Sequence, residues 1–531
     1  MIAFKINILP IPIPVAVQLI LMRLLLKISP IIKLLPFLCL VACTSVPNPS
    51  ANWHVNAVSL YDSGHDKGTE IISVQQTTLR AVLSNFDTGE VDVLDVSQPT
   101  YLKRTARFNL RLSKGEELTS VAFHPTLDVF AAVIDAGNSP GRLEIRSAST
   151  GAMIDRITVG FGPDAVVFSG DGSVLMIANE GEDFLFEPLK KQFFSPEGSI
   201  SLVRLSKTGH INSHKNLELA DMINHQTIVI NQGGRFMERE IDWNGDGKIS
   251  KKIDFDGDGV IDKKKVLLGY FEGRDVFGTE TSGEKKILIP IKTHSPALLE
   301  PEYIAISPDA SKAFVTLQED DAVAVVDLIN EHVMSYYGLG ATHHKTDARY
   351  DGWIKFNQPL TGLREPDGIT TVANGRYFVT ADEGDTDSDS ASLADGQPTS
   401  GGRSVSVFDA ATGTLLGDTG NQLDETAFAN KVYPERRSNR KGSEPEMLVA
   451  IDLDGVPYVA VGMERAGAVE LISLADPSHP KVVALGKIAG DENKSPEGIA
   501  HFEVSGEHYV ITANEMSGTV ECFKISRNFA Q

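Results

Sequence analysis

Cysteine is scarce in this chain, which contains three cysteines among 531 residues. If a leader were removed ahead of Cys43, only Cys522 would remain besides it, so no structural disulfide is expected even in an oxidising compartment. The sequence also lacks a Gly-x-Ser-x-Gly elbow, a Walker loop, a Cys-x-x-Cys pair and a His-Glu-x-x-His motif. These absences remove the usual signatures of a serine hydrolase, a P-loop NTPase, a thiol oxidoreductase and a zinc peptidase.

Positive charge is also in short supply. The chain has 49 Lys and Arg against 71 Asp and Glu, which gives a formal net charge of -22. Such a field repels nucleic acid and attracts cations, so nucleic acid is excluded as an expected partner. The hydrophobic fraction of 42% is ample for a globular core. Length alone does not separate two or three ordinary domains from one long all-β unit.

The first 42 residues are strongly apolar and almost free of acidic residues. They end in Leu40-Val41-Ala42-Cys43, after which the chain turns polar, as at a bacterial lipobox. We therefore expect residues 1–43 to be a lipoprotein signal peptide with its lipobox, starting at Met1 or at Met22. An alternative is a transmembrane anchor, since the apolar stretch is long enough to span a bilayer. Five prolines argue against that alternative: Pro10, Pro12, Pro14, Pro30 and Pro36.

Lipidation at Cys43 predicts an exported, lipid-anchored protein at the outer membrane or cell surface of a bacterium. Thr44 follows Cys43, where an Asp would resemble an inner-membrane retention signal, and this favours the outer membrane.

A block of constant layout recurs from about residue 53 to the end of the chain. Its clearest copy starts at Glu497, passes a turn at Gly506 and an apolar run at 509–512, and ends at 518–523. The shortest interval between starts is 47 residues, which fits one four-stranded propeller blade. Seven starts predict an all-β, seven-bladed β-propeller over residues 53–531. Two β-sandwiches are the alternative, although sandwiches need no recurring block.

Longer intervals between starts locate insertions. The largest is expected at 206–295, and a shorter one includes the acidic run 385–390. Such loops are where propellers carry individual function.

The large insertion contains two aspartate-rich loops in phase, at 242–250 and 254–262. Oxygen ligands at alternate positions, with glycine at the bend, are what Ca²⁺ requires, and Ca²⁺ is the expected cofactor. The expected donors are Asp242, Asn244, Asp246, Ser250 and the Lys248 carbonyl, and then Asp254, Asp256, Asp258, Asp262 and the Val260 carbonyl.

Neither loop has Glu at its twelfth position, where Ile253 and Lys265 stand, so paired EF-hands are not expected. The offset of the two loops resembles that of thrombospondin type 3 repeats and dockerins. A structural role for the ion is expected, and the alternative is a solvated cluster of Asp-Gly turns.

Each block opens with one acidic residue. If the opening strand is the innermost of its blade, these carboxylates form a ring at one mouth of the channel, which would concentrate cations. The members of this acidic ring are Glu70, Glu117, Asp164, Glu302, Asp367, Glu446 and Glu497. The residues that end the next strand, at 179–180, 382–383, 464–465 and 514–515, would form an outer tier. The alternative is that all of these residues only cap strands and turns.

Three further polar pairs carry less information. His343-His344 is expected in a solvent-facing loop rather than at a metal. Arg364-Glu365 and Arg436-Arg437 are expected to form surface salt bridges rather than an anion site.

An ordered series of these motifs resembles the choice-of-anchor I family, which is similar to mesenchyme-specific cell-surface glycoproteins. The matching segments are 364–369, 381–385, 402–408, 444–446, 495–499 and 513–515. The resemblance covers most of the chain after Trp53 and implies a surface-displayed propeller with YVTN- or WD40-like repeats and varied anchors. Asp382 departs from the pattern, because it stands where Asn is expected between Ala381 and Glu383.

Taken together, the sequence favours a non-enzymatic binding or structural module that is anchored by lipid and binds Ca²⁺. Some relatives carry phosphatase or phytase-like labels, and the alternative is therefore a calcium-dependent phosphoric ester hydrolase with ions at Glu302, Asp367, Glu446 or Glu497. A third reading is a scaffold that presents loops to a surface ligand or a protein partner.

Overall fold

A computed structural model describes residues 52–182, 185–187, 192–194, 196–219, 236–240, 265–271, 274–280, 286–287, 299–384, 401–490 and 494–528. Cys43, the aspartate loops at 242–262 and the acidic run 385–390 lie outside these residues. Among the residues that are described, no helix is both long and apolar enough to pass through a membrane.

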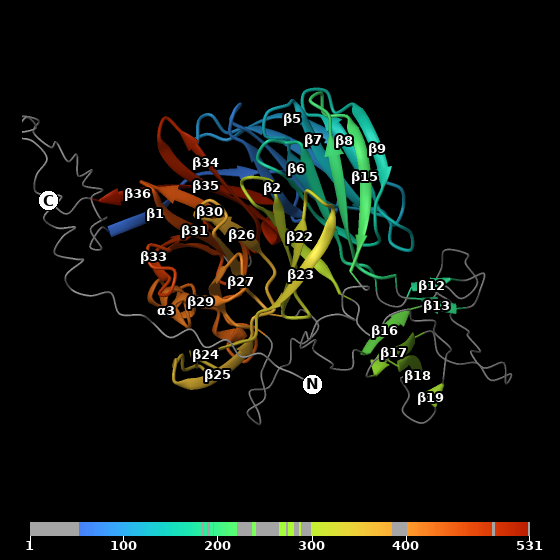
Figure 1. Ribbon diagram of the computed structural model, residues 1–531. Coiled ribbons are helices and arrows are strands. Elements are labelled where there is room, and N and C mark those ends of the chain that lie inside the picture. The colour runs from blue at the N-terminus through green and yellow to red at the C-terminus, as the bar shows by residue number, and fades with distance from the viewer. Residues whose placement is uncertain are drawn as a thin grey trace, which may run out of the picture. The chain divides into compact units, whose positions relative to one another are not determined.

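Seven four-stranded antiparallel sheets follow one another along the chain (Figure 1). The first contains β2 (Thr69–Gln75), β3 (Arg80–Asn85), β4 (Glu90–Asp95) and β5 (Lys103–Asn109). The second contains β6 (Glu117–Phe123), β7 (Val129–Asp135), β8 (Arg142–Ser147) and β9 (Met153–Thr158). The third contains β10 (Pro163–Phe168), β11 (Val174–Asn179), β14 (Ser199–Leu205) and β15 (Ile211–Glu218). The fourth contains β20 (Pro301–Ile306), β21 (Lys312–Leu317), β22 (Ala322–Asp327) and β23 (His332–Gly338).

The fifth sheet contains β26 (Ile369–Val372), β27 (Tyr377–Asp382), β28 (Ser404–Asp409) and β29 (Leu415–Asp418). The sixth contains β30 (Pro445–Leu453), β31 (Val456–Met463), β32 (Ala468–Ser473) and β33 (Lys481–Lys487). The seventh contains β34 (Pro496–Val504), β35 (Glu507–Asn514), β36 (Thr519–Asn528) and, from the other end of the chain, β1 (Asn52–Asp62).

Smaller elements lie within or between the blades. They are β12 (Leu185–Glu187) and β13 (Gln192–Phe194), β24 (Ala341–Thr346) and β25 (Gln358–Leu363), α3 (Gln422–Ala429), η2 (Glu435–Arg437) and η3 (Glu515–Ser517). A further four-stranded sheet contains β16 (Phe236–Glu240), β17 (Lys265–Phe271), β18 (Arg274–Glu280) and β19 (Lys286–Ile287).

The first strand of each sheet contacts the first strand of the next. The contacts run from β2 to β6, β10, β20, β26, β30 and β34, and then from β34 back to β2. A closed cycle of seven innermost strands is the defining feature of a seven-bladed propeller, so the predicted fold is confirmed.

Closure of the ring depends on β1. This strand pairs with β36 in antiparallel register, from Asn52 opposite Asn528 to Asp62 opposite Thr519, and the two lie side by side in Figure 1. The last blade therefore takes its outer strand from the start of the described chain, which leaves no unpaired break between the seventh blade and the first.

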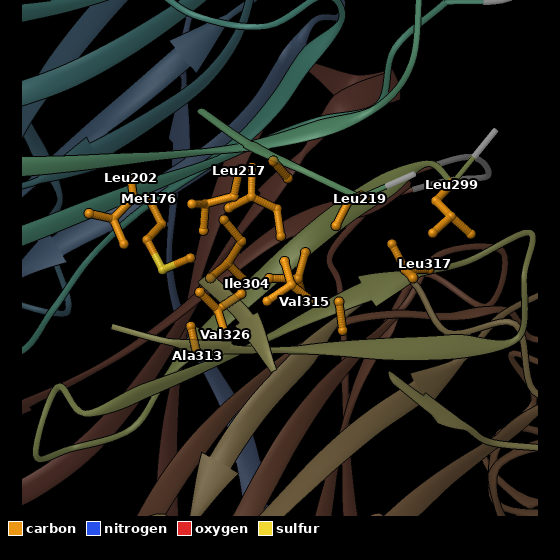
Figure 2. Packing of buried hydrophobic residues seen from close by; sticks show 14 of the residues in the cluster. Met176, Leu202, Leu217, Leu219, Leu299, Ile304, Ala313, Val315, Leu317 and Val326 are labelled. Atoms are coloured by element: carbon orange, nitrogen blue, oxygen red, sulfur yellow. The ribbon is translucent and has the colours of Figure 1, made fainter. Parts of the chain in front are cut away.

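Blade faces are apolar because the middle strands carry continuous runs of small and β-branched residues, which suit strands buried on both faces. Between the third and fourth blades, for example, Met176 and Leu202 pack with Ile304 and Val315 (Figure 2).

The third blade corrects one predicted boundary. The insertion was expected at 206–295, but residues 211–218 form β15, which pairs with β14 as the outer strand of this blade. The segment between the last strand of the third blade and the first strand of the fourth is therefore 219–300. Most residues of β15 are polar and exposed, so the strand lacks the alternation of apolar and polar residues that marks a strand in a sequence. This is why the sequence pattern predicts an insertion over these residues.

Candidate functional site

The seven residues of the acidic ring occupy equivalent positions in the fold. Six of them are the first or second residue of an innermost strand, and Asp367 lies two residues before β26. Because the innermost strands start at the same end of their blades, these carboxylates face one end of the propeller.

A local irregularity follows the acidic residue in six of the seven blades. In β10, for example, the pairing with β11 shifts between Pro163 and Val166, and similar shifts occur in β2, β6, β20, β30 and β34. Bulges of this kind re-aim a side chain relative to the sheet. The shift therefore turns each carboxylate away from the blade faces that form the core.

The third and fourth blades bring three carboxylates together. Ligand oxygens of Asp164, Glu180 and Glu302 all lie within 4.8 Å of one another, and all three side chains are partly exposed. Burial, and then the neighbouring carboxylates, raise the pKa values of Glu180 and Glu302 well above their usual range. Burial raises the pKa of Asp164 to about 6. Among the described residues no Lys or Arg forms an ion pair with these three, so we call them the uncompensated triad.

The fifth and sixth blades gather carboxylates differently. Asp367, Glu383 and Glu446 form one group within 4.8 Å, and Glu383 joins Glu444 and Glu464 in a second. Burial, and then Glu383, raise the pKa of Asp367 to about 7.

This second site contains its own cations. The Nζ atom of Lys441 lies 2.5 Å from Glu383 Oε1 and 3.7 Å from Glu444 Oε1. Arg437 donates to Glu444 at 2.6 Å, and Arg465 lies 2.6 Å from Glu464. We call this group the compensated site, because a buried lysine and two partly exposed arginines offset its negative charge.

The remaining ring members, Glu70, Glu117 and Glu497, belong to neither group, and burial, followed by Glu464, raises the pKa of Glu497 well above its usual range. Burial, followed by Asp164, Glu515 and Glu117, raises the pKa of Glu70 well above its usual range. Oε2 of Glu70 is buried and has no hydrogen-bond partner among the described residues. Glu117 is exposed, so this member contributes charge rather than a buried ligand.

The expected outer tier divides into two roles. Asn179 is fully buried and donates to Ser199 and Ser201, whereas Glu180 next to it belongs to the uncompensated triad. Asp382 takes the place of Asn179 in the fifth blade, where it accepts hydrogen bonds from Ser404 and Ser406. The departure of Asp382 from the family pattern is therefore accommodated by hydroxyl donors, and Glu383 stays in the site.

Arg364 was expected in a surface salt bridge, and this expectation is wrong. Its side chain is only 2% exposed, and it donates to Asp418 Oδ2 at 2.7 Å and to Ser406 Oγ at 2.8 Å. The sequence gives no sign of this burial, because the acceptors come from the ends of β23 and β29. His343 and His344 were expected in a loop but lie in β24, where His344 Nε2 is 2.8 Å from the Gly402 carbonyl.

Two buried carboxylates lie away from the ring, at the same position in the third strand of their blades. Glu144 in β8 is 0% exposed and pairs with Arg142, Arg146 and Arg156. Glu470 in β32 is also 0% exposed, but neither of its oxygens has a hydrogen-bond partner among the described residues. Burial, and then Asp424, raise the pKa of Glu470 well above its usual range.

Replacing each of these two glutamates by leucine should change the free energy of unfolding in opposite directions. We expect Glu470→Leu to raise the free energy of unfolding by about 1–3 kcal/mol, because an unsatisfied buried carboxyl is replaced by an apolar side chain. Glu144→Leu should lower it by about 3 kcal/mol, because three arginines lose their shared partner. Urea unfolding of both variants checks this, and equal effects of the two changes would contradict it.

One protein family matches most of the chain, and the similarities to solved structures are distant. The model of the choice-of-anchor I domain matches residues 70–400 and 387–477. No curated protein matches the chain. Among solved structures, the chain is similar to Kuenenia stuttgartiensis hydrazine synthase, with 12% identity, a TM-score of 0.48, and coverage of 88% of this chain and 97% of the other. It is also similar to Saccharomyces cerevisiae Sqt1, with 9% identity, a TM-score of 0.45, and coverage of 89% and 99%. At these identities neither similarity carries information about function.

Proposed function

The chain belongs to the choice-of-anchor I family, and from this premise we propose that it is a lipid-anchored surface module whose acidic ring and aspartate loops hold Ca²⁺. Membership of the family indicates a cell-surface structural or binding module of a bacterium. The lipid anchor and the metal are the further steps of the proposal.

One observation carries the metal. The uncompensated triad places three carboxylates within 4.8 Å of one another, and burial, followed by neighbouring carboxylates, raises the pKa values of Glu180 and Glu302 well above their usual range, so a cation's charge would take over the role of their protons. A hard divalent cation prefers several carboxylate oxygens. Oε2 of Glu446, in the compensated site, is also buried without a hydrogen-bond partner among the described residues.

The anchor and the loops rest on the sequence. Cys43 follows a lipobox, and acyl chains at this residue would hold the propeller at a membrane without a spanning helix. Ca²⁺ bound by the loops at 242–250 and 254–262 would order the insertion, whereas Ca²⁺ at the ring would bridge neighbouring blades.

The ring predicts an unusual pH dependence. Without metal, stability should fall as the pH rises from about 4 to about 7, since the folded-state pKa values of Asp164 (about 6) and Asp367 (about 7) lie above the ordinary value of 3.8. In this window the folded protein holds protons that the unfolded chain has released. Ca²⁺ should reverse the loss, by about 2.7 kcal/mol at a hundredfold excess over Kd, and should act strongly at about pH 7.5 but weakly at about pH 5.

Thermal unfolding in chelator and in excess Ca²⁺ at the two pH values measures this dependence. The double variant Asp164→Asn, Glu302→Gln should remove the part of the pH dependence that comes from Asp164 and much of the calcium effect, whereas the part that comes from Asp367 should remain. A matched control is Glu507→Gln, on an exposed side chain of β35 that pairs with Lys524. An unchanged calcium effect in the double variant would place the metal elsewhere.

Calorimetric calcium stoichiometry together with phosphate release from a phosphoric ester separates the module from the hydrolase. The two carboxylate sites favour the hydrolase as second candidate, because they could hold the several ions that it needs. Bound Ca²⁺ without turnover supports the binding module. Chelator-sensitive turnover that is lost with Asp164→Asn, Glu302→Gln supports the hydrolase.

A further inference from the structure

The hairpin of the seventh blade carries two histidines and a glutamate on one face. β34 contributes His501 and Glu503, and β35 contributes His508. Glu503 lies directly opposite His508 in the register, and His501 lies opposite Val510. Residues two apart on a strand share a face, so the hairpin pairing brings all three side chains together.

The ligand atoms of this group are already close. His501 Nε2 lies 3.1 Å from His508 Nδ1, and His508 Nδ1 lies 3.7 Å from Glu503 Oε1. All three ligand atoms are within 4.8 Å of one another. Two ligand nitrogens on one tetrahedral zinc ion, each at about 2.0–2.1 Å, are roughly 3.3 Å apart, so the histidine pair needs little adjustment.

The backbone that carries these side chains is held firmly. Ser505 and Gly506 both have positive φ, at 55° and 78°, as in the two-residue turns that match the twist of a hairpin. Gln76, from the first blade, donates to the Glu503 carbonyl at 2.8 Å and accepts from its amide at 2.8 Å. The site is therefore built on two paired strands that a neighbouring blade fixes in place.

From this geometry we propose that His501, Glu503 and His508 bind a divalent transition-metal ion such as Zn²⁺. Two imidazoles and one carboxylate suit such an ion, and three protein ligands leave a position for water. The present hydrogen bond holds one proton between the two rings. Metal binding moves that proton to the other nitrogen of the donor ring, which frees both facing nitrogens to bind the metal.

The site lies four to six residues along β34 from Glu497, which is about 13–20 Å, so it is separate from the acidic ring.

Zn²⁺ binding to the full chain in excess Ca²⁺ tests the proposal, because Ca²⁺ occupies carboxylate sites and leaves imidazole nitrogens free. We expect one Zn²⁺ per chain in calorimetry. His508→Gln should weaken binding about 100-fold or more, and Glu503→Gln about 10-fold. His479→Gln, on an exposed histidine of the sixth blade, should leave binding unchanged.

A spectroscopic readout keeps the test independent of folding. Cu²⁺ loaded in place of Zn²⁺ should show coupling to two imidazole nitrogens in electron paramagnetic resonance, and to one in His508→Gln. Binding of equal strength in wild type and His508→Gln, or a copper signal without nitrogen coupling, overturns the proposal. Either result leaves calcium binding at the acidic ring untouched, because no ligand is shared.

Discussion

Deletion of residues 52–62 is expected to abolish the cooperative unfolding transition of the propeller. These residues form β1, the outer strand of the seventh blade, and their removal exposes the edge of β36. Val55 is buried on β1, Trp53 packs edge-on against Tyr458 at 5.3 Å, and Tyr61 donates to Asp92 at 2.7 Å. Each large buried side chain contributes roughly 1.5–3 kcal/mol, so the loss reaches about 5 kcal/mol or more and consumes most of a typical stability.

Chemical unfolding followed by circular dichroism measures this effect. The control begins at Asn52, the first residue of β1, and so keeps the whole strand. A second variant moves residues 52–62 to the C-terminus through a short linker after Asn528. Because Asn52 pairs with Asn528, the moved strand can form a hairpin with β36 and restore closure. Stability of the deleted chain equal to that of the control would show that β1 does not close the ring.

Arg364→Met is expected to lower the free energy of unfolding by about 3–5 kcal/mol. The guanidinium lies in the interior of the fifth blade, where it donates to Asp418, to Ser406 and to the carbonyls of Leu339 and Gly340. Without it, the buried carboxyl of Asp382 loses the charge that lies 3.8 Å away, and two carbonyls lose their donor. Removal of one partner from a buried pair costs far more than the pair itself contributes.

Arg376→Met is the matched control, because Arg376 is exposed in the turn between β26 and β27 of the same blade. Its guanidinium stacks over Tyr377 at 5.0 Å, and a contact of this kind at an exposed site contributes about 0.5–1 kcal/mol. Urea midpoints of the two variants compare the effects. If Arg364→Met costs no more than Arg376→Met, the buried network of Arg364 is not stabilising.

The acidic ring could be located from the sequence because it follows the blade period. One carboxylate opens each repeat, and a repeat that stacks radially must bring its equivalent positions to one end. Glu180 and Glu383 could be placed near the ring for the same reason, since each directly follows the second strand of its blade.

The lysine and arginines of the compensated site could not be predicted in this way, because they do not recur with the blade repeat. Lys441 and Arg437 come from the connection between the fifth and sixth blades, and single insertions of this kind leave no trace in a repeat. The group of His501, Glu503 and His508 could not be predicted from the sequence for another reason. His501, Glu503 and His508 are close in sequence, but their common face becomes visible only when the turn at Ser505 sets the hairpin register.

Because of Lys441, the compensated site and the uncompensated triad should depend differently on the cations in the medium. A lysine is a cation that the chain always carries, so the compensated site keeps its charge balance in any medium. Among the described residues no Lys or Arg pairs with the uncompensated triad, so we expect its charge balance to follow the cations in the medium. As the calcium concentration falls, the contact between the third and fourth blades should therefore weaken before the contact between the fifth and sixth. The stability of only one part of the propeller would then depend on the calcium concentration around the cell.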